Sequence, residues 1–411
     1  MFSYAESNCS LASRAMRAKY SIGVVASLLA AATAALAAPC PPVVTALAAK
    51  VAALRGLTSS FAPPCTLVAP AGLPRELDRK LRHDLPIAPE EFIEALVRSG
   101  FVDGDPSTIY KRLLDFYSSQ VLGFYEPGAD ELVVVNGPGA AQAESSLVWA
   151  HELEHAVQEH RFHLPSRLLA MRDDGDEQRA ASAVAEGEAM LVMFLVTTPS
   201  ADAAALEQAE RAVREQAHAL GTPTGVPAYF VADLVFPYTV GFSAVLRTYR
   251  AGGWPAVDRL LARPPTTTSE LLHPDRTAPP GRVAAAQLPP APAGYEEVLT
   301  DTVGEWGLAF LLGRPMDARQ ADALAAGWDG DRLRLARDKA DPGRWALAWR
   351  IQARTVAARG ELENALRREL PGLLVHLAPP GAPPLSWVAS GRTLEVRAAW
   401  PTGQRRPRSP S

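Results

Sequence analysis

The chain has 411 residues, of which 48% are hydrophobic and 21% are charged. This length and composition exclude a mini-protein and a wholly disordered chain, and they predict a folded globular protein. The formal net charge is −4, from 41 basic and 45 acidic residues, so there is no global basic field to hold phosphate groups. We therefore expect no nucleic-acid partner. The 36 prolines predict long irregular connections between elements.

The first forty residues have the pattern of an export signal. Three basic residues precede a charge-free stretch, residues 20–38, which is closed by the small-residue run Ala35-Leu36-Ala37. The pattern predicts a signal peptide over residues 1–37 and a protein that is secreted or held in the periplasm or cell envelope. The alternative is that the segment stays as a membrane anchor, because its length is close to the roughly 20 residues that span a bilayer.

The predicted signal peptide determines which cysteines remain in the mature chain. Cys9 lies upstream of the predicted cleavage site and also upstream of Met16, which with Met1 is one of two candidate translation starts. The mature chain therefore keeps Cys40 and Cys65. In an oxidising compartment these two residues can form a disulfide, and we take that bridge as a hypothesis.

The N-terminal region, residues 38–117, has a helical pattern. Apolar residues recur at spacings of three and four over residues 43–57 and 90–97, and an amphipathic pattern follows over residues 107–117. No residue in this region points to chemistry.

After this region, the spacing of apolar residues changes from one typical of helices to one typical of strands. Residues 121–125 and 132–135 are short apolar runs on either side of a turn sequence, residues 126–130, and they predict a hairpin. The second strand could be an edge strand that pairs with an extended peptide, or an interior strand. Three helices are predicted next, over residues 145–160, 176–196 and 204–219.

The first of these helices carries the sequence His151-Glu152-Leu153-Glu154-His155. Residues four apart lie on one face of a helix, so both imidazoles can bind one metal ion, with Glu152 beside the open coordination position. Zn²⁺ held in this way lowers the pKa of its bound water towards about 7, and an adjacent carboxylate can take the proton as the water attacks a carbonyl group. The pattern therefore predicts a zinc site with Glu152 as the general base. His160 and His163, further along, are predicted surface residues.

The third ligand must come from elsewhere, because catalytic zinc takes three protein ligands. Glu186 is the best candidate, because it interrupts an otherwise apolar helix, where a buried carboxylate needs a partner or a metal. Glu188 points about 200° away around the helix and must have a different role. Gly187 and Ala189 are small enough to let this helix approach the first closely. The alternative is a solvated helix edge with both acids in water.

The remainder of the chain divides by composition. Residues 118–276 form the predicted catalytic region, and residues 277–294 form a proline-rich linker. A C-terminal α/β region over residues 295–402 ends in a predicted hairpin of residues 385–388 and 393–400. Residues 403–411 are predicted to be a disordered tail.

Several motifs, taken together and in this order, resemble one family. They are Gly123-Phe124-Tyr125-Glu126-Pro127, the helix from His151 to Gln158, Glu186-Gly187-Glu188-Ala189, Phe236-Pro237-Tyr238-Thr239-Val240-Gly241, Gly252-Gly253-Trp254, Pro264-Pro265-Thr266-Thr267-Thr268, Leu271-Leu272-His273-Pro274 and Gly327-Trp328-Asp329-Gly330-Asp331. The chain is similar in these motifs to uncharacterised bacterial zinc metallopeptidases of the gluzincin type. Glu154, Glu159 and His163 depart from residues common in that family, and all three lie beside the predicted ligands.

The resemblance implies an α+β, zincin-like fold in which His151, His155 and Glu186 bind zinc and Glu152 acts as the base. Attack on a carbonyl group also needs a donor for the oxygen that becomes negative. Tyr238 and His273 are the candidates, because each lies in a shared motif; the alternatives are a core aromatic residue and a helix-stop histidine.

The sequence thus predicts an exported zinc metallopeptidase that acts on a peptide or protein substrate. Two alternatives stay open: a non-catalytic metal-binding or scaffold protein on a zincin frame, and a zinc hydrolase of non-peptide amides or esters. The sequence leaves the oligomeric state and the cleavage preference open.

Overall fold

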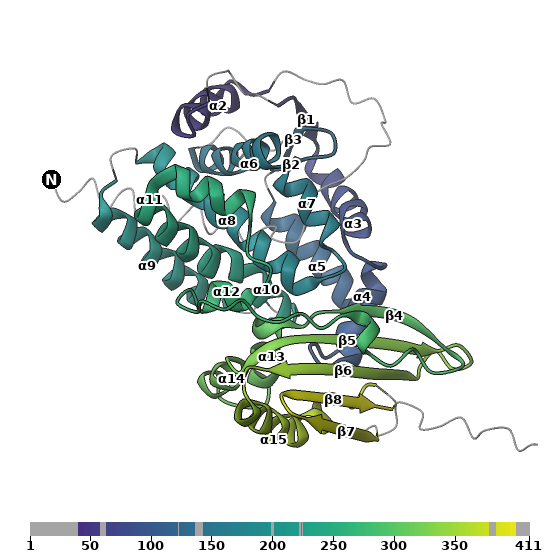
Figure 1. Ribbon diagram of the computed structural model, residues 1–411. Helices are drawn as coiled ribbons and strands as arrows, with labels where there is room; N and C mark the ends of the chain where they lie inside the picture. Colours follow the sequence, from purple (N-terminus) through teal and green to yellow (C-terminus); the bar gives the residue numbers. More distant parts are fainter. Residues whose placement is uncertain are drawn as a thin grey trace, which may run out of the picture. The chain divides into compact units, whose positions relative to one another are not determined.

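The computed structural model describes residues 40–57, 63–121, 123–135, 143–198, 201–221, 223, 225–377 and 384–399 (Figure 1). The predicted signal peptide, Cys9 and the predicted tail lie outside the described residues. The fold is α+β, as predicted, with many helices and two sheets. The chain forms two compact units, Met1–Pro89 with Ser107–Asp275 and Glu90–Pro106 with Arg276–Ser411.

The first unit contains most of the helices and a small sheet. Its helices are α2 (Pro42–Leu54), η1 (Pro70–Gly72), α3 (Leu73–Asp84), α5 (Pro106–Gln120), α6 (Ala143–Phe162), α7 (Leu164–Ala170), α8 (Gly175–Thr197), α9 (Ala203–Leu220), α10 (Ala228–Phe236), the π-helical turn η2 (Pro237–Gly241), α11 (Phe242–Ala262) and α12 (Thr268–Leu272). Its strands are β1 (Cys65–Val68), β2 (Gly123–Glu126) and β3 (Glu131–Val135). The predicted helices over residues 145–160, 176–196 and 204–219 are confirmed as α6, α8 and α9.

The small sheet corrects one reading of the predicted hairpin. The strand order is β1-β3-β2, so β3 is the central strand; it runs parallel to β1 and antiparallel to β2. The edge-strand interpretation of residues 132–135 is therefore wrong, and the interior alternative holds. The reason is β1, a strand from the N-terminal region that the helical pattern there did not predict. Among the described strands, β2 is the edge on the side away from β1.

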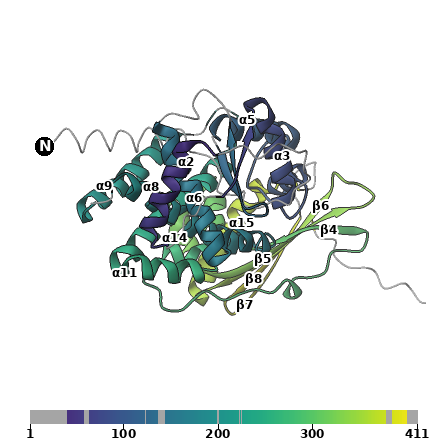
Figure 2. The same cartoon turned by 90° about the horizontal axis from the view of Figure 1, so that it is seen from above.

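Helix α2 packs on the face of α6 that carries Leu153 and Val157. Its apolar face, with Val44, Leu47 and Val51, is buried in one core cluster with Leu153 and Val157 of α6. Figure 2 shows α2 running beside α6 and α8. Burial of these aliphatic side chains stabilises each contact by about 1.5–3 kcal/mol per side chain, so α2 is an integral part of the first unit.

The disulfide hypothesis is confirmed in the structure. Cys40 and Cys65 are bonded across a sequence separation of 25 residues, which ties the start of α2 to the start of β1. The bridge restricts the unfolded chain and so favours the folded state.

Replacing both Cys40 and Cys65 with Ser is expected to lower the free energy of unfolding by about 2–4 kcal/mol, because the unfolded chain regains the entropy of an open loop. Urea unfolding under non-reducing conditions measures this loss. A thiol titration of the non-reduced protein is expected to find neither Cys40 nor Cys65 free, and two reactive thiols at these positions would contradict the bridge.

Helix α8 is the central element of the first unit. Asp174 caps its start by accepting a hydrogen bond from the backbone N–H of Glu177, at 3.2 Å. From Ala180 to Met193 every residue is buried, so the helix has no solvated face. By length and hydropathy α8 and the continuous stretch Ala228–Ala262 could each cross a membrane. This is weak evidence for a membrane span, because 89% and 61% of their apolar windows are buried inside the protein.

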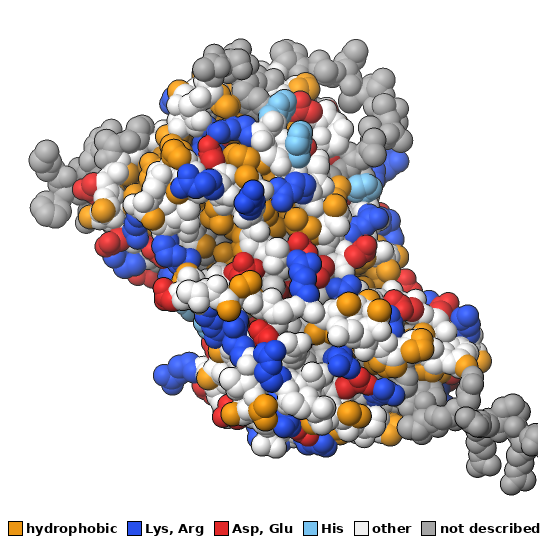
Figure 3. Space-filling model, in the orientation of Figure 1, with side chains coloured by type: hydrophobic (Ala, Val, Ile, Leu, Met, Phe, Trp, Pro, Cys, Tyr) orange, Lys and Arg blue, Asp and Glu red, His pale blue; other side chains and the backbone are white. Residues whose placement is uncertain are grey.

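The second unit is built on a five-stranded antiparallel sheet of order β4-β5-β6-β8-β7. Its strands are β4 (Tyr295–Asp301), β5 (Trp328–Asp338), β6 (Trp345–Ala353), β7 (Leu385–Ser390) and β8 (Thr393–Ala398), and its helices are α4 (Pro89–Arg98), η3 (Ala285–Gln287), α13 (Gly304–Gly313), α14 (Ala318–Ala325) and α15 (Val356–Leu373). The predicted C-terminal hairpin is confirmed as β7 and β8. On the face drawn in Figure 3, each unit carries both basic and acidic side chains.

A buried carboxylate organises one end of this sheet. Asp331 on β5 accepts hydrogen bonds from the indole N–H groups of Trp328 and Trp349, at 2.9 and 2.8 Å. It also accepts from the backbone N–H groups of Val303 and Gly304, at 3.1 and 2.9 Å. All four donors lie in the second unit. The second aspartate of the Gly-Trp-Asp-Gly-Asp motif, Asp331, therefore has a structural role.

Candidate metal centre

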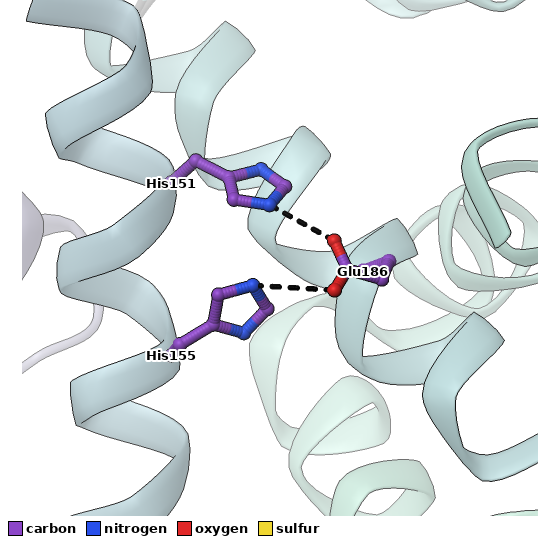
Figure 4. A group of neighbouring side chains, drawn as sticks. All are labelled: His151, His155 and Glu186. Carbon is purple, nitrogen blue, oxygen red and sulfur yellow. Dashed lines mark hydrogen bonds and ion pairs between the residues drawn. The ribbon is translucent and has the colours of Figure 1, made fainter. Parts of the chain in front are cut away.

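Two helices bring the three predicted ligands together. On α6, His151 and His155 are one turn apart and share a face, and Glu186 on α8 lies opposite them (Figure 4). The Glu186 carboxylate reaches both rings: its Oε2 lies 2.9 Å from Nε2 of His151, and its Oε1 lies 3.5 Å from Nε2 of His155. The ligand atoms of the three residues lie within 4.8 Å of one another. Among the described residues, this group could hold a metal ion.

The donor set fits a zinc-type centre. Two imidazole nitrogens and one carboxylate oxygen are zinc ligands, and bond lengths near 2.0–2.1 Å in a tetrahedron place ligand atoms about 3.3 Å apart. The observed separations need only small side-chain adjustments to reach this value. Nδ1 of His155 lies 3.0 Å from Oε1 of Gln158, so the ring nitrogen that faces Glu186 is left as the ligand atom. The residues that are present therefore fit a divalent metal ion.

The charges at the site favour a cation. Burial would raise the pKa of Glu186, but the two imidazoles beside it hold that pKa well below its usual range. Burial would lower the pKa of His155, but the Glu186 carboxylate, and then Glu152, raise it to about 9. The carboxylate thus stays ionised and draws positive charge towards the two rings. A divalent cation can supply that charge in place of a proton.

Glu152 lies beside the ligands and is held by the sheet. Its side chain is half-buried, and Oε2 accepts a hydrogen bond from the backbone N–H of Tyr125 on β2, at 3.2 Å. That N–H points away from β3, on the side of β2 that has no partner strand among the described residues. The Tyr125 hydroxyl donates to Asp130 at 2.8 Å, and the same Asp130 carboxylate lies 3.0 Å from Nε2 of His160. These contacts hold the β2–β3 turn on α6 and so fix the strand that orients Glu152.

Tyr238 reaches the same centre from the π-helical turn η2. Its ring centroid lies 6.2 Å from that of His151, and its hydroxyl is within hydrogen-bonding reach of Glu186. Burial, and then the negative charges of Glu186 and Glu152, raise the pKa of Tyr238 well above 10. The phenol is therefore neutral and can donate a hydrogen bond at any physiological pH. Single π-helical turns are often found at functional sites.

A glycine pair lets η2 approach α8 this closely. A Cβ at Gly187 would overlap the backbone of Gly241, and a Cβ at Gly241 would overlap the backbone of Ala183. We expected Gly187 to allow contact with α6; instead it faces Gly241 of η2, while Glu186 and Glu188 on either side of it contact α6. The glycine contact places Tyr238 against Glu186.

Gly241→Ala is expected to destabilise the first unit by about 1–3 kcal/mol, because the added methyl group has no space against the Ala183 carbonyl. The free energy of unfolding in urea measures this effect. Gly72→Ala is the matched control in the same unit, since its added Cβ would meet Val68 at an ordinary 3.5 Å. We expect the control to change stability by no more than about 0.5 kcal/mol. Equal stability of the two variants would contradict the close crossing.

The other predicted histidines lie outside the three-residue group. His273 caps the C-terminal end of α12, and it is not a member of the group that could bind a metal. Thr268 at the start of that helix donates to Asp176, at 2.5 Å, which ties α12 to the first turn of α8. His160 and His163 are exposed, as predicted.

Four buried polar residues near the site were not predicted as functional. Glu154, Gln158 and Glu188 are fully buried beside the ligands, and Arg55 of the N-terminal region reaches them. Glu186 is also buried, with 7% of its surface exposed, so the solvated-edge alternative for the two acids of α8 is wrong. The signal for Glu188 was present, because it interrupts the same apolar helix. Arg55 follows α2 as a single residue without any pattern.

The first unit thus contains a candidate metal centre of two histidines and Glu186, with Glu152 beside it. Comparison with known families finds one match: residues 293–391, in the second unit, match a domain of unknown function, DUF8575. This match covers about a quarter of the chain and excludes the metal centre. No curated protein and no solved structure matches the chain.

Proposed function

We propose that this protein is a zinc-dependent metallopeptidase on a zincin-like frame. The observation that carries the proposal is the convergence of His151, His155 and Glu186, with their ligand atoms within 4.8 Å of one another and Glu152 one residue from the first ligand. The resemblance of the sequence motifs to gluzincin-type peptidases supports the same reading.

The residues divide the chemistry among them. When bound, a zinc ion would lower the pKa of a water molecule to about 7 and polarise a carbonyl group. Glu152 takes the proton from the attacking water and returns it to the leaving amine, since its carboxylate is fixed by the Tyr125 N–H and is half-open to solvent. His151, His155 and Glu186 hold the ion, and Gln158 sets the ring of His155.

A peptide is the substrate that the surrounding backbone favours. The outer side of β2 has no partner strand among the described residues and lies next to Glu152, so an extended chain could pair there through backbone groups other than the Tyr125 N–H, which Glu152 holds. The sequence offered this role for residues 132–135; because β3 is an interior strand, we propose β2 in its place. Export of the protein belongs to the same proposal, and it is supported by the leader pattern and by the Cys40–Cys65 bridge.

Tyr238 is the proposed donor to the oxygen of the attacked carbonyl group, because it lies at the centre and is neutral. Tyr238→Phe is expected to lower kcat by about 10²–10³-fold with little change in KM. Zinc content is the control: it should stay near that of the wild type. A variant that loses zinc instead, or that keeps its full kcat, would show that the hydroxyl serves only to hold Glu186.

The substrate class is tested by parallel digestion. A peptide library and a panel of small amide and ester substrates are incubated with the zinc-loaded protein, with and without a chelator. We expect chelator-sensitive cleavage in the library. Turnover of the small acyl substrates alone would favour a non-peptide hydrolase, and turnover of neither by the zinc-loaded protein would favour a metal-binding scaffold.

A further inference from the structure

A buried arginine stands behind the metal centre. Arg55 follows the last turn of α2, and its side chain is fully buried. Its Nε lies 2.9 Å from Oε1 of Glu154 and 3.0 Å from Oε1 of Glu188. Its Nη2 lies 2.8 Å from Oδ1 of Asp258. One guanidinium group therefore joins α2 to α6, α8 and α11.

Glu188 connects Arg55, through Gln158, to the predicted metal ligand His155. Its other oxygen, Oε2, accepts a hydrogen bond from Nε2 of Gln158, at 2.7 Å, and the same Nε2 donates to the carbonyl oxygen of Ala185, at 2.8 Å. With both amide hydrogens used, Oε1 of Gln158 must face His155 and accept from its Nδ1, at 3.0 Å. Nδ1 of His155 therefore keeps its hydrogen, and Nε2 is the nitrogen whose proton a metal ion would replace.

The position of Arg55 is itself determined by α11. The chain bends at Gly252 and Gly253, where Gly253 has a φ of 59°, and the bend is followed by Trp254. The Trp254 ring covers the guanidinium group, with Cζ of Arg55 4.2 Å from the ring centroid. Asp258 lies one turn later. Its Oδ1 pairs with Arg55, and its Oδ2 lies 2.7 Å from Nη2 of Arg161. The Gly-Gly-Trp motif thus has a structural role, because the bend places the Trp254 ring on the Arg55 guanidinium group.

Without Arg55, the two carboxylates of Glu154 and Glu188 would be buried next to each other with no cation. Buried charges that lose their partner are strongly unfavourable, so Glu188 would have to move or change its partner. Gln158 would then lose the acceptor that orients its amide. His151 is in contact with Glu186, and the series from Arg55 through Glu188 and Gln158 ends at His155, so we expect the larger effect at His155.

We propose that Arg55, carried by the disulfide-tethered helix α2, is a positioning residue for the metal ligand His155, acting through Glu188 and Gln158. The inference rests on the proposed metal centre and adds a role for the N-terminal region, which contributes no ligand. Outer contacts of this kind change metal affinity by about 10–100-fold when they are broken.

The test compares Arg55→Met with Arg161→Met. Both variants remove a cation from Asp258, but only the first removes the contact with Glu188. Zinc affinity is measured by competition with a chelator, and Co²⁺ is used as a spectroscopic probe. We expect Arg55→Met to bind zinc on the order of 10–100-fold more weakly and to shift the visible absorption of bound Co²⁺. Arg161→Met should match the wild type in both.

Arg55→Lys keeps the proposal testable if Arg55→Met does not fold, as judged by circular dichroism. Lysine retains the charge, but a single ammonium group cannot hold three carboxylates in the geometry of a guanidinium fork, so several-fold weaker zinc binding is expected. Wild-type zinc affinity and an unchanged Co²⁺ spectrum in a folded Arg55 variant would overturn the inference. A wild-type protein that binds no zinc would overturn the proposed function, and the inference with it.

Discussion

Glu152→Gln is expected to keep its zinc and to lose about 10²–10⁴-fold in kcat/KM for peptide cleavage. The amide has the same shape and can still receive the Tyr125 N–H, at present 3.2 Å from Oε2, but it cannot take a proton from water. The ligands His151 and His155 are unchanged, so metal content should stay at about one ion per chain. Cleavage rates on a peptide substrate and metal analysis of the same sample measure both quantities.

A matched control comes from the same helix. Glu159 is also half-buried, and its carboxylate accepts hydrogen bonds from Ser166, at 2.9 and 2.7 Å, outside the metal-binding group. Glu159→Gln should retain activity, because it changes the charge of α6 by the same amount without touching the centre. If Glu152→Gln with bound zinc cleaves peptides at the wild-type rate, the role given to Glu152 is wrong.

Glu186→Ala is expected to bring the zinc content after dialysis from about one ion per chain to near zero, and activity with it. The variant leaves two imidazoles and removes the negative charge that lies 2.9 and 3.5 Å from them. Two neutral ligands on one helix hold a divalent ion far more weakly than three ligands that include a carboxylate. Elemental analysis after exhaustive dialysis measures the loss.

Glu177→Ala provides the comparison on the same helix, since Glu177 lies in the first turn of α8, about two and a half turns from Glu186. It should keep its zinc. Undiminished zinc in Glu186→Ala would instead require another ligand, and the carboxylate of Glu188 would be the first to examine, although it faces Gln158 and Arg55.

The sequence allowed α6 and the three residues that could hold a metal ion to be predicted, because their signals are local. The i, i+4 spacing of His151 and His155 places them on one face whatever surrounds the helix. Glu186 could be selected because a carboxylate in an apolar helix needs a partner. The same reasoning applied to Glu188 would have predicted a buried partner for it as well.

The remaining parts of the site could not be predicted from local patterns. Arg55 is 99 positions from Glu154 in the chain, and nothing in its neighbourhood distinguishes it from a solvated arginine after a helix. The strand β1 is four residues long and takes its place from its parallel pairing with β3 and from the Cys40 bridge. The three-stranded order, and with it the edge position of β2, depends on this distant pairing.

The central claim is that one zinc ion at His151, His155 and Glu186 is required for peptide cleavage. The most direct measurement is the metal content of the purified wild-type chain together with its cleavage of a peptide library, before chelation, after chelation and after zinc is returned. We expect about one zinc per chain, loss of metal and cleavage together, and recovery of both when zinc is returned. Cleavage that persists after all metal has been removed, or a folded chain that takes up no zinc, would contradict it.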